Sequence, residues 1–167
     1  MLAAASFWTL DREAAFKRAK LGAVWLVTAL GIPMLWMGKE FGHSTRQTSN
    51  QSNKLQWSLF KNQPNYEWLA FYKHVILLRE KVSALYTENV GFFHENAETK
   101  VLAYYRWSDE GTRAVIVANF SDTYLSGNSI PNFLAGTWHE WIYNKILEVG
   151  EEGFKFDLPE WSAQVFV

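Results

Sequence analysis

The stretch Gly31-Ile32-Pro33-Met34-Leu35-Trp36-Met37-Gly38-Lys39-Glu40-Phe41-Gly42 decides how the first half of the chain is interpreted. Pro33 has no N–H and disfavours the α region for the residue before it, so a preceding helix should end here. The uncharged run 34–37 is typical of a strand that is buried on both faces in a parallel sheet. Gly38 and Gly42 then allow a tight loop that places the Glu40 carboxylate at the end of this strand. In a β/α barrel, that end of the strands carries the chemistry.

This stretch resembles the eighth barrel strand and the following loop of the α-amylase superfamily of glycoside hydrolases. The most similar pattern is Gly-Ile-Pro-Met-Leu-Phe-Met-Gly-Gln-Glu-Phe-Gly, found in 1,4-α-glucan branching enzymes, from which this chain departs at Trp36 and Lys39. Residues 65–80 also resemble the last helix of that barrel. The resemblance implies that the chain starts inside a catalytic barrel, and we expect it to be a fragment of a longer enzyme.

The elements expected before the second half fit this interpretation. A helix is predicted over 11–30, with Asp11 as its cap, followed by the strand 34–37. Residues 43–54 form a polar loop, which either borders an active-site cleft or lacks structure without the rest of a barrel. A second helix is predicted from Pro64, which suits a first turn. Its apolar stripe comprises Trp68, Phe71, Val75, Leu78 and Val82.

From Val90 onward, the hydrophobic period changes to two, which indicates strands. Turn residues separate strands expected over 101–107, 113–120, 136–143, 154–158 and 161–167. We therefore predict an α+β fragment: the last helix–strand–helix of a (β/α)8 barrel (residues 1–86), followed by an antiparallel all-β sandwich (residues 87–167). Three strand motifs, 101–104, 115–121 and 136–138, resemble the C-terminal all-β domain of the amylase superfamily.

Composition excludes several other classes of protein. The net charge is −1 and no cluster of Lys and Arg occurs, which argues against a nucleic-acid partner. There is no cysteine, so neither a disulfide frame nor a Cys metal site is expected, and a cytoplasmic location is compatible with this. The uncharged run 21–38 is interrupted by Gly31 and Pro33, so we expect no membrane span. The four histidines show no paired spacing for zinc and no phosphate loop is present, so no cofactor or metal is expected.

The chain alone should be catalytically inactive. Retaining glycoside cleavage needs two carboxylates about 5–5.5 Å apart. The resemblance places the catalytic carboxylates on barrel strands four, five and seven, before Met1, and no His-Asp dipeptide occurs in the chain. Glu40 is the only carboxylate predicted at a strand end. We expect it to organise the floor of a substrate cleft through hydrogen bonds rather than to be catalytic.

Two functions of different class remain. The first is a structural role in an α-glucan-acting enzyme of the branching-enzyme or amylase type, with the rest of the barrel and a glycogen- or starch-like glucan as partners. The second is a glucan-binding module in which exposed rings stack on sugar, because a flat ring matches the apolar face of a pyranose. Trp138, Trp141 and Trp161 are the candidate rings, although Trp138 and Trp141 should point to opposite faces of their strand. A free-standing interaction domain is a third possibility, and an exposed barrel remnant should self-associate.

Overall fold

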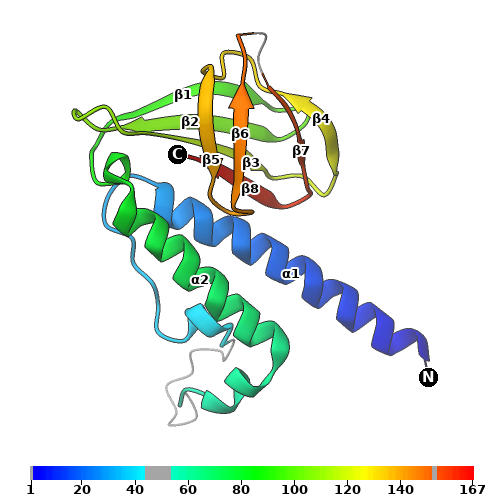
Figure 1. The fold of residues 1–167 in the computed structure, drawn as a ribbon. Coiled ribbons are helices and arrows are strands. Elements are labelled where there is room, and N and C mark those ends of the chain that lie inside the picture. Colours follow the sequence, from blue (N-terminus) through cyan, green and yellow to red (C-terminus); the bar gives the residue numbers. More distant parts are fainter. Residues whose placement is uncertain (1, 44–53, 152–153) are drawn as a thin grey trace.

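The computed structural model describes residues 2–43, 54–151 and 154–167. Two helices, α1 (Leu2–Thr28) and α2 (Gln63–Lys81), lie below a domain of β-strands (Figure 1). Short 3-10 helices occupy the connections: η1 (Lys39–Phe41), η2 (Trp57–Lys61) and η3 (Ser83–Leu85). None of the described helices is both long and apolar enough to span a membrane.

The β domain consists of antiparallel strands in two sheets. The larger sheet has the order β1-β2-β3-β8-β5-β6, and the smaller one pairs β4 with β7. The last strand in the sequence is therefore central in the larger sheet. The bounds of the strands are Val90–Asn96 (β1), Val101–Trp107 (β2), Arg113–Asn119 (β3), Leu125–Ser129 (β4), Gly136–Glu140 (β5), Lys145–Val149 (β6), Lys155–Leu158 (β7) and Ser162–Phe166 (β8).

The two faces of the β1-β2-β3-β8 part of the sheet pack against different partners. On one face, Tyr104, Ile116 and Val165 share a buried core with residues of α1 and α2. On the other face, Val101 and Val117 join a second core that includes residues of β5, β6 and β7. Figure 1 shows β5 and β6 crossing in front of β1–β3. The sheet thus separates the two helices from a second layer of strands.

Both predicted helices are present, with different starts. α1 begins at Leu2, so Asp11 lies inside the helix and the prediction that it caps the helix is wrong. α2 begins at Gln63 and carries Pro64 in its first turn, as predicted. Trp68, Val75 and Leu78 of its stripe are buried. The predicted loop 43–54 lies, apart from its two end residues, outside the described residues.

The predicted strand 34–37 is wrong, because residues 32–36 are irregular and join no sheet. Ile32 is 96% exposed and Met34 is 77% exposed. A parallel strand needs neighbours for its backbone N–H and C=O groups, and the described part of the chain places no strand beside this segment. The helix–strand–helix of the predicted barrel remnant therefore occurs here as helix, extended segment and helix.

The antiparallel all-β character of the second half is confirmed. The strands expected over 101–107, 113–120, 154–158 and 161–167 correspond to β2, β3, β7 and β8. The strand predicted over 136–143 ends at Glu140, because the Glu140 carboxylate accepts hydrogen bonds from the N–H groups of Ile142 and Tyr143 and turns the chain. Strands β4 and β6 were not predicted.

Candidate functional site

Glu40 lies in η1, between two glycines in the left-handed region. The φ angles are 92° at Gly38 and 74° at Gly42, which favours glycine at both ends of the loop. Helix α2 holds this loop, because the Asn65 side chain donates to the Phe41 carbonyl at 2.7 Å and the Trp68 indole donates to the Lys39 carbonyl at 2.7 Å. The tight glycine loop predicted from the sequence is present.

The Glu40 carboxylate itself is incompletely satisfied. Its Oε2 atom is buried and has no hydrogen-bond partner among the described residues. Burial raises the pKa of Tyr72, and the charge of Glu40 raises it further, so the two side chains act on one another electrostatically. An adjacent hollow of about 840 Å³ is lined by residues of α1, α2 and the 34–43 segment. The predicted hydrogen-bonding role of Glu40 stays a prediction.

Trp138 and Trp141 lie on opposite faces, as their spacing indicates, and neither ring is fully exposed. Trp138 is 7% exposed and belongs to the inner core, where its indole donates to the Leu134 carbonyl at 3.0 Å. The expectation that Trp138 presents an exposed ring is therefore wrong, because β5 turns this side toward the core that it shares with β2 and β3. The sugar-stacking role of these rings stays a prediction.

Trp141 lies at the interface between the β domain and α2. Its indole donates to the His74 carbonyl at 3.1 Å, and His74 Nε2 lies 2.7 Å from the Trp141 carbonyl oxygen. The two rings stack with centroids 5.5 Å apart. Trp161 is half-buried beside α1, with the Arg18 guanidinium 4.5 Å from its ring centroid. The structure thus distributes Glu40, Trp138 and Trp141 over three separate places.

Two arginines that the sequence did not single out join the helices to the β domain. Arg106 of β2 is fully buried and donates to the carbonyls of Thr28, Thr87 and Asn89. Arg79 of α2 donates to the carbonyls of Val27, Ala29 and Gly31. Together they satisfy the carbonyl groups at the end of α1, which a helix leaves without internal partners. Lys17 adds an ion pair to Glu160 at 2.7 Å.

No described group of three or more His, Cys, Asp or Glu side chains could hold a metal ion. The acidic groups with shifted pKa values serve the fold. Burial raises the pKa of Glu140, which accepts hydrogen bonds from three backbone N–H groups. The Gly127 N–H and the Tyr124 hydroxyl lower the pKa of Asp157. These contacts stabilise the turn after β5 and the pair of strands β4 and β7.

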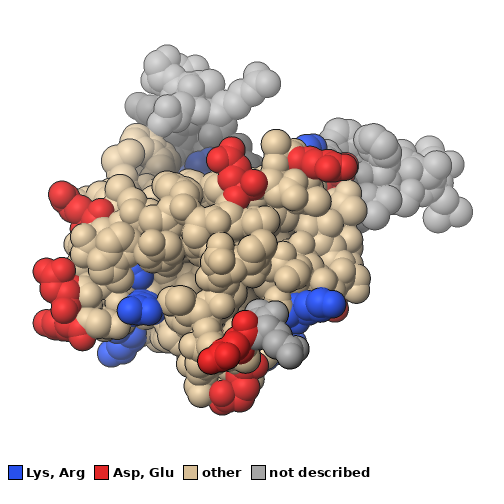
Figure 2. Space-filling model, turned by 90° about the horizontal axis from the view of Figure 1, so that it is seen from above, with Lys and Arg blue, Asp and Glu red and all other residues tan. Residues whose placement is uncertain are grey.

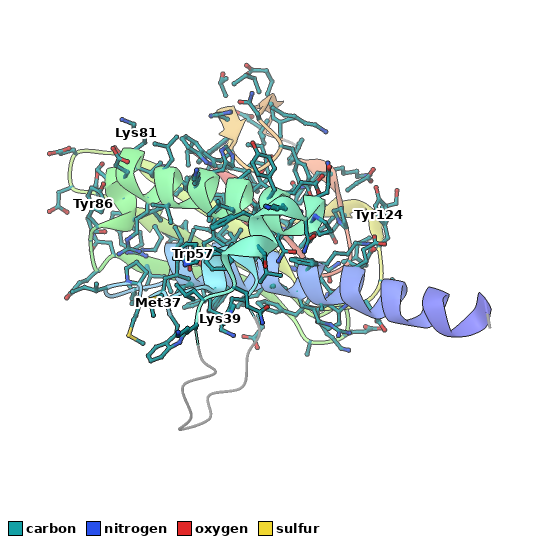
Figure 3. The ribbon with its side chains drawn as sticks, turned by 90° about the horizontal axis from the view of Figure 1, so that it is seen from below. Met37, Lys39, Trp57, Lys81, Tyr86 and Tyr124 are labelled. Carbon is teal, nitrogen blue, oxygen red and sulfur yellow. The ribbon has the colours of Figure 1, made fainter. Side chains whose placement is uncertain are left out.

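Several large apolar side chains are exposed in the segments before and after the Glu40 loop. We call this set the apolar underside. Figure 3 shows Met37 and Trp57 on the side of the helices that faces away from the β domain. These side chains are between 51% and 96% exposed, whereas such residues are usually buried. The apolar underside consists of Leu30, Ile32, Met34, Trp36, Met37 and Trp57.

Comparison with known proteins identifies the class of the β domain. Residues 93–167 match the family model described as alpha amylase, C-terminal all-beta domain. Neopullulanase 2 from Thermoactinomyces vulgaris is 24% identical over 146 residues, which are 87% of this chain and 25% of that protein. The matched residues make up slightly less than half of the chain, and this part is similar to the C-terminal all-β domain of α-amylases.

Solved structures share the fold of most of the chain. AmyP in complex with maltose matches with a TM-score of 0.75 at 14% identity, covering 90% of this chain and 34% of that one. The α-amylase from Geobacillus thermoleovorans, complexed with acarbose, matches with a TM-score of 0.73 at 19% identity, covering 90% and 33%. The chain therefore spans about a third of these structures and a quarter of the neopullulanase. None of these three proteins is named as a branching enzyme, and that finer identity stays a prediction.

Proposed function

We propose that this chain is the C-terminal portion of an α-glucan-acting enzyme. In this proposal, residues 1–86 complete the catalytic barrel and residues 87–167 are the attached all-β domain. The observation that carries the proposal is the apolar underside. Ile32 and Met34 are almost fully exposed in a segment whose sequence is that of a buried strand. Neighbouring barrel strands would cover this segment and pair with its backbone.

The energy of such docking is substantial. Burial of a large apolar side chain contributes about 1.5–3 kcal/mol relative to its exposed state. Each member of the apolar underside would supply a share of this order, reduced by what is already covered in the chain. Glu40 would lie at the edge of the completed barrel, where a donor from the rest of the enzyme would satisfy its buried Oε2.

The proposed parent enzyme carries its catalytic carboxylates outside this chain, so the chain alone is inactive. A parent of the branching-enzyme type cleaves an α-1,4 linkage and transfers the released chain to a 6-hydroxyl, without an organic cofactor. A parent of the amylase type hydrolyses the same linkage. The similarity of residues 31–42 to the branching-enzyme pattern favours the first type, and a cytoplasmic location accompanies it in the proposal.

Sequencing of the coding DNA upstream of Met1 tests the proposal most directly. We expect an open frame that encodes the remaining barrel strands and a His-Asp pair within a few dozen residues. A stop codon and a ribosome-binding site immediately before Met1 would contradict it.

Reconstitution provides the functional test. The upstream segment, co-expressed with this chain, should act on amylose, whereas either part alone should not. The variant Ile32→Lys should prevent assembly, because it places a charge in the buried contact. Ile146→Lys, on the exposed face of β6, is the matched control and should assemble normally. Formation of new α-1,6 branch points would identify a branching enzyme, and shorter linear products would identify an amylase.

A glucan-binding module is the second candidate, and it is favoured by a groove of the β domain that the rings of Phe93, Tyr105 and Trp107 line. Retardation in a native gel containing glycogen tests it. Trp138→Ala removes a core side chain and should reduce stability, so loss of retardation in that variant counts only if the variant stays folded.

A further inference from the structure

A second hollow lies in the β domain, on the face of the sheet turned away from the helices. We call it the aromatic groove. Its volume is about 540 Å³, which is within the range of small-molecule sites. Tyr104 and Ala114 of the same two strands pack toward α1 and α2, so their neighbours Tyr105 and Arg113 point to the opposite face. Docking of a barrel on the helices would therefore leave this groove free.

Three rings form the apolar part of the groove. Phe93 and Tyr105 have centroids 5.7 Å apart and an interplanar angle of 46°. Tyr105 and Trp107 have centroids 5.1 Å apart and an interplanar angle of 35°. The successive tilts make a curved surface rather than a flat one. Tyr105, the middle one of the three rings, is 37% exposed.

The position of the Tyr105 ring depends on Gly91 in the neighbouring strand. Gly91 is paired with Tyr105, and a Cβ atom at residue 91 would lie 2.6 Å from Tyr105 Cζ. The ring therefore lies across the glycine backbone in a place that only glycine leaves open. A larger residue at position 91 would therefore displace the ring from the groove.

Polar groups without partners surround the rings. The Arg113 guanidinium is exposed and makes no side-chain hydrogen bond or ion pair with any described residue, and the same holds for the Trp107 indole N–H and the Asn132 amide. The groove is lined by Phe93, Tyr105, Trp107, Ser108, Gly111, Arg113, Val115, Asn132 and Leu134, with no carboxylate among them. Apolar ring faces next to free hydrogen-bond donors suit a ligand with many hydroxyl groups. On the face of the molecule seen in Figure 2, charged side chains lie mainly around the edge.

We propose that the aromatic groove binds an α-1,4-glucan chain as an ancillary site. The apolar faces of two neighbouring glucose units stack on Tyr105 and Trp107, and their hydroxyl oxygens accept hydrogen bonds from Arg113 and the Trp107 indole. An α-1,4-linked chain curves along its length, which fits tilted rings, whereas a β-1,4-linked chain is flat. The choice of an α-glucan also rests on the proposed function of the parent enzyme.

Titration of the full chain with maltoheptaose tests this proposal, with tryptophan fluorescence and calorimetry as readouts. Tyr105→Ala and Trp107→Ala should each weaken binding about tenfold or more, because each removes a stacking surface. Trp57→Ala removes an even more exposed ring, at the apolar underside, and should leave the affinity unchanged. Arg113→Glu keeps the core intact and should also weaken binding, so the test does not depend on the aromatic variants alone.

Three results would overturn the proposal. The first is that the wild-type chain does not bind maltoheptaose. The second is that folded Trp107→Ala and Arg113→Glu bind maltoheptaose as tightly as the wild-type chain does. The third is that the wild-type chain binds cellohexaose as tightly as maltoheptaose. The outcome is separable from that of the proposed function. If the upstream DNA encodes a barrel but the groove does not bind maltoheptaose, only the proposed ancillary site is refuted. If the groove binds maltoheptaose but no upstream barrel is encoded, only the proposed parent enzyme is refuted.

Discussion

Among single residues, Arg106 is the one whose substitution should cost most. It is a fully buried cation whose hydrogen-bond partners are carbonyl groups, not a carboxylate. Burial lowers the pKa of Arg106, but a guanidinium stays protonated in proteins. Its planar fork serves two segments at once: the end of α1, through Thr28, and the connection between η3 and β1, through Thr87 and Asn89.

Arg106→Met should lower the free energy of unfolding by about 3 kcal/mol, because three buried carbonyl groups lose their donor. Arg106→Lys should recover only part of this loss, since an ammonium group cannot reach all three acceptors from one position. Urea unfolding measures both effects. Arg113→Met is the control from the adjacent strand, where the guanidinium is exposed, and it should be nearly neutral. Equal losses at both positions would contradict the role given to Arg106.

Tyr104 predicts how stability changes at alkaline pH. Its hydroxyl lies 2.6 Å from Thr28 Oγ1, and burial raises the pKa of Tyr104 to about 12 from 10.0. The folded state therefore binds the phenolic proton more tightly than the unfolded state, and this contribution to stability is present below pH 10 and is lost as the pH rises toward 12. In Tyr104→Phe, the fall in stability over this window should be smaller. Denaturant titrations at several alkaline pH values measure the difference. An identical slope in the two proteins would contradict the prediction.

Secondary-structure elements show where the sequence is sufficient and where it is not. Strand β2 could be predicted from its period-two pattern, and β3 from its continuous apolar run, which reflects burial of both faces. Helix α2 could be predicted from its apolar stripe. Strand β4 could not, because its sequence is mostly polar or glycine and only pairing with the distant β7 defines it. Strand β6 could not, because most of its residues are exposed and its pairing with β5 defines it. The segment 34–37 carries the pattern of a buried strand, but a pattern cannot supply the neighbouring strands.

At the candidate site, too, some features could be predicted from the sequence and others depend on tertiary packing. The glycine loop around Glu40 was predictable, since positive φ angles select glycine. The burial of Trp138 was not, because which face of β5 packs on the core shared with β2 and β3 depends on tertiary packing. Tyr105 and Trp107 were visible as alternating residues of one strand, yet only the structure shows that the Tyr105 ring lies over Gly91 of the neighbouring strand.

The end of helix α1 should depend on Arg79, because its guanidinium takes the place of a local cap. Arg79→Met should increase amide hydrogen exchange over the last turn of α1, including the Ala29 N–H that donates to the Trp25 carbonyl. Lys81→Met, at an exposed position at the end of α2, should leave these exchange rates in α1 unchanged. Unchanged protection of Ala29 in Arg79→Met would show that the helix end is stable without the arginine.

For the whole molecule, exposed apolar area predicts self-association of the isolated chain. The apolar underside gathers large side chains on one side of the helices, and such patches drive association in water. Light scattering should therefore show dimers or larger species at micromolar concentration. The double variant Ile32→Lys and Met34→Lys should shift the distribution toward monomer, whereas Ile146→Lys on β6 should not. A monodisperse wild-type monomer would contradict the prediction.

The central place of β8 has a consequence for the order of events during synthesis. A ribosome makes β1, β2, β3, β5 and β6 before β8, although β8 lies between β3 and β5 in the sheet. Until residues 162–166 emerge, nothing joins β1-β2-β3 to β5-β6. Helix α1 also lacks one of the strands that it contacts in the folded chain. A nascent chain stalled before this point would hold two unjoined hairpin layers with open backbone edges, the kind of intermediate that chaperones bind.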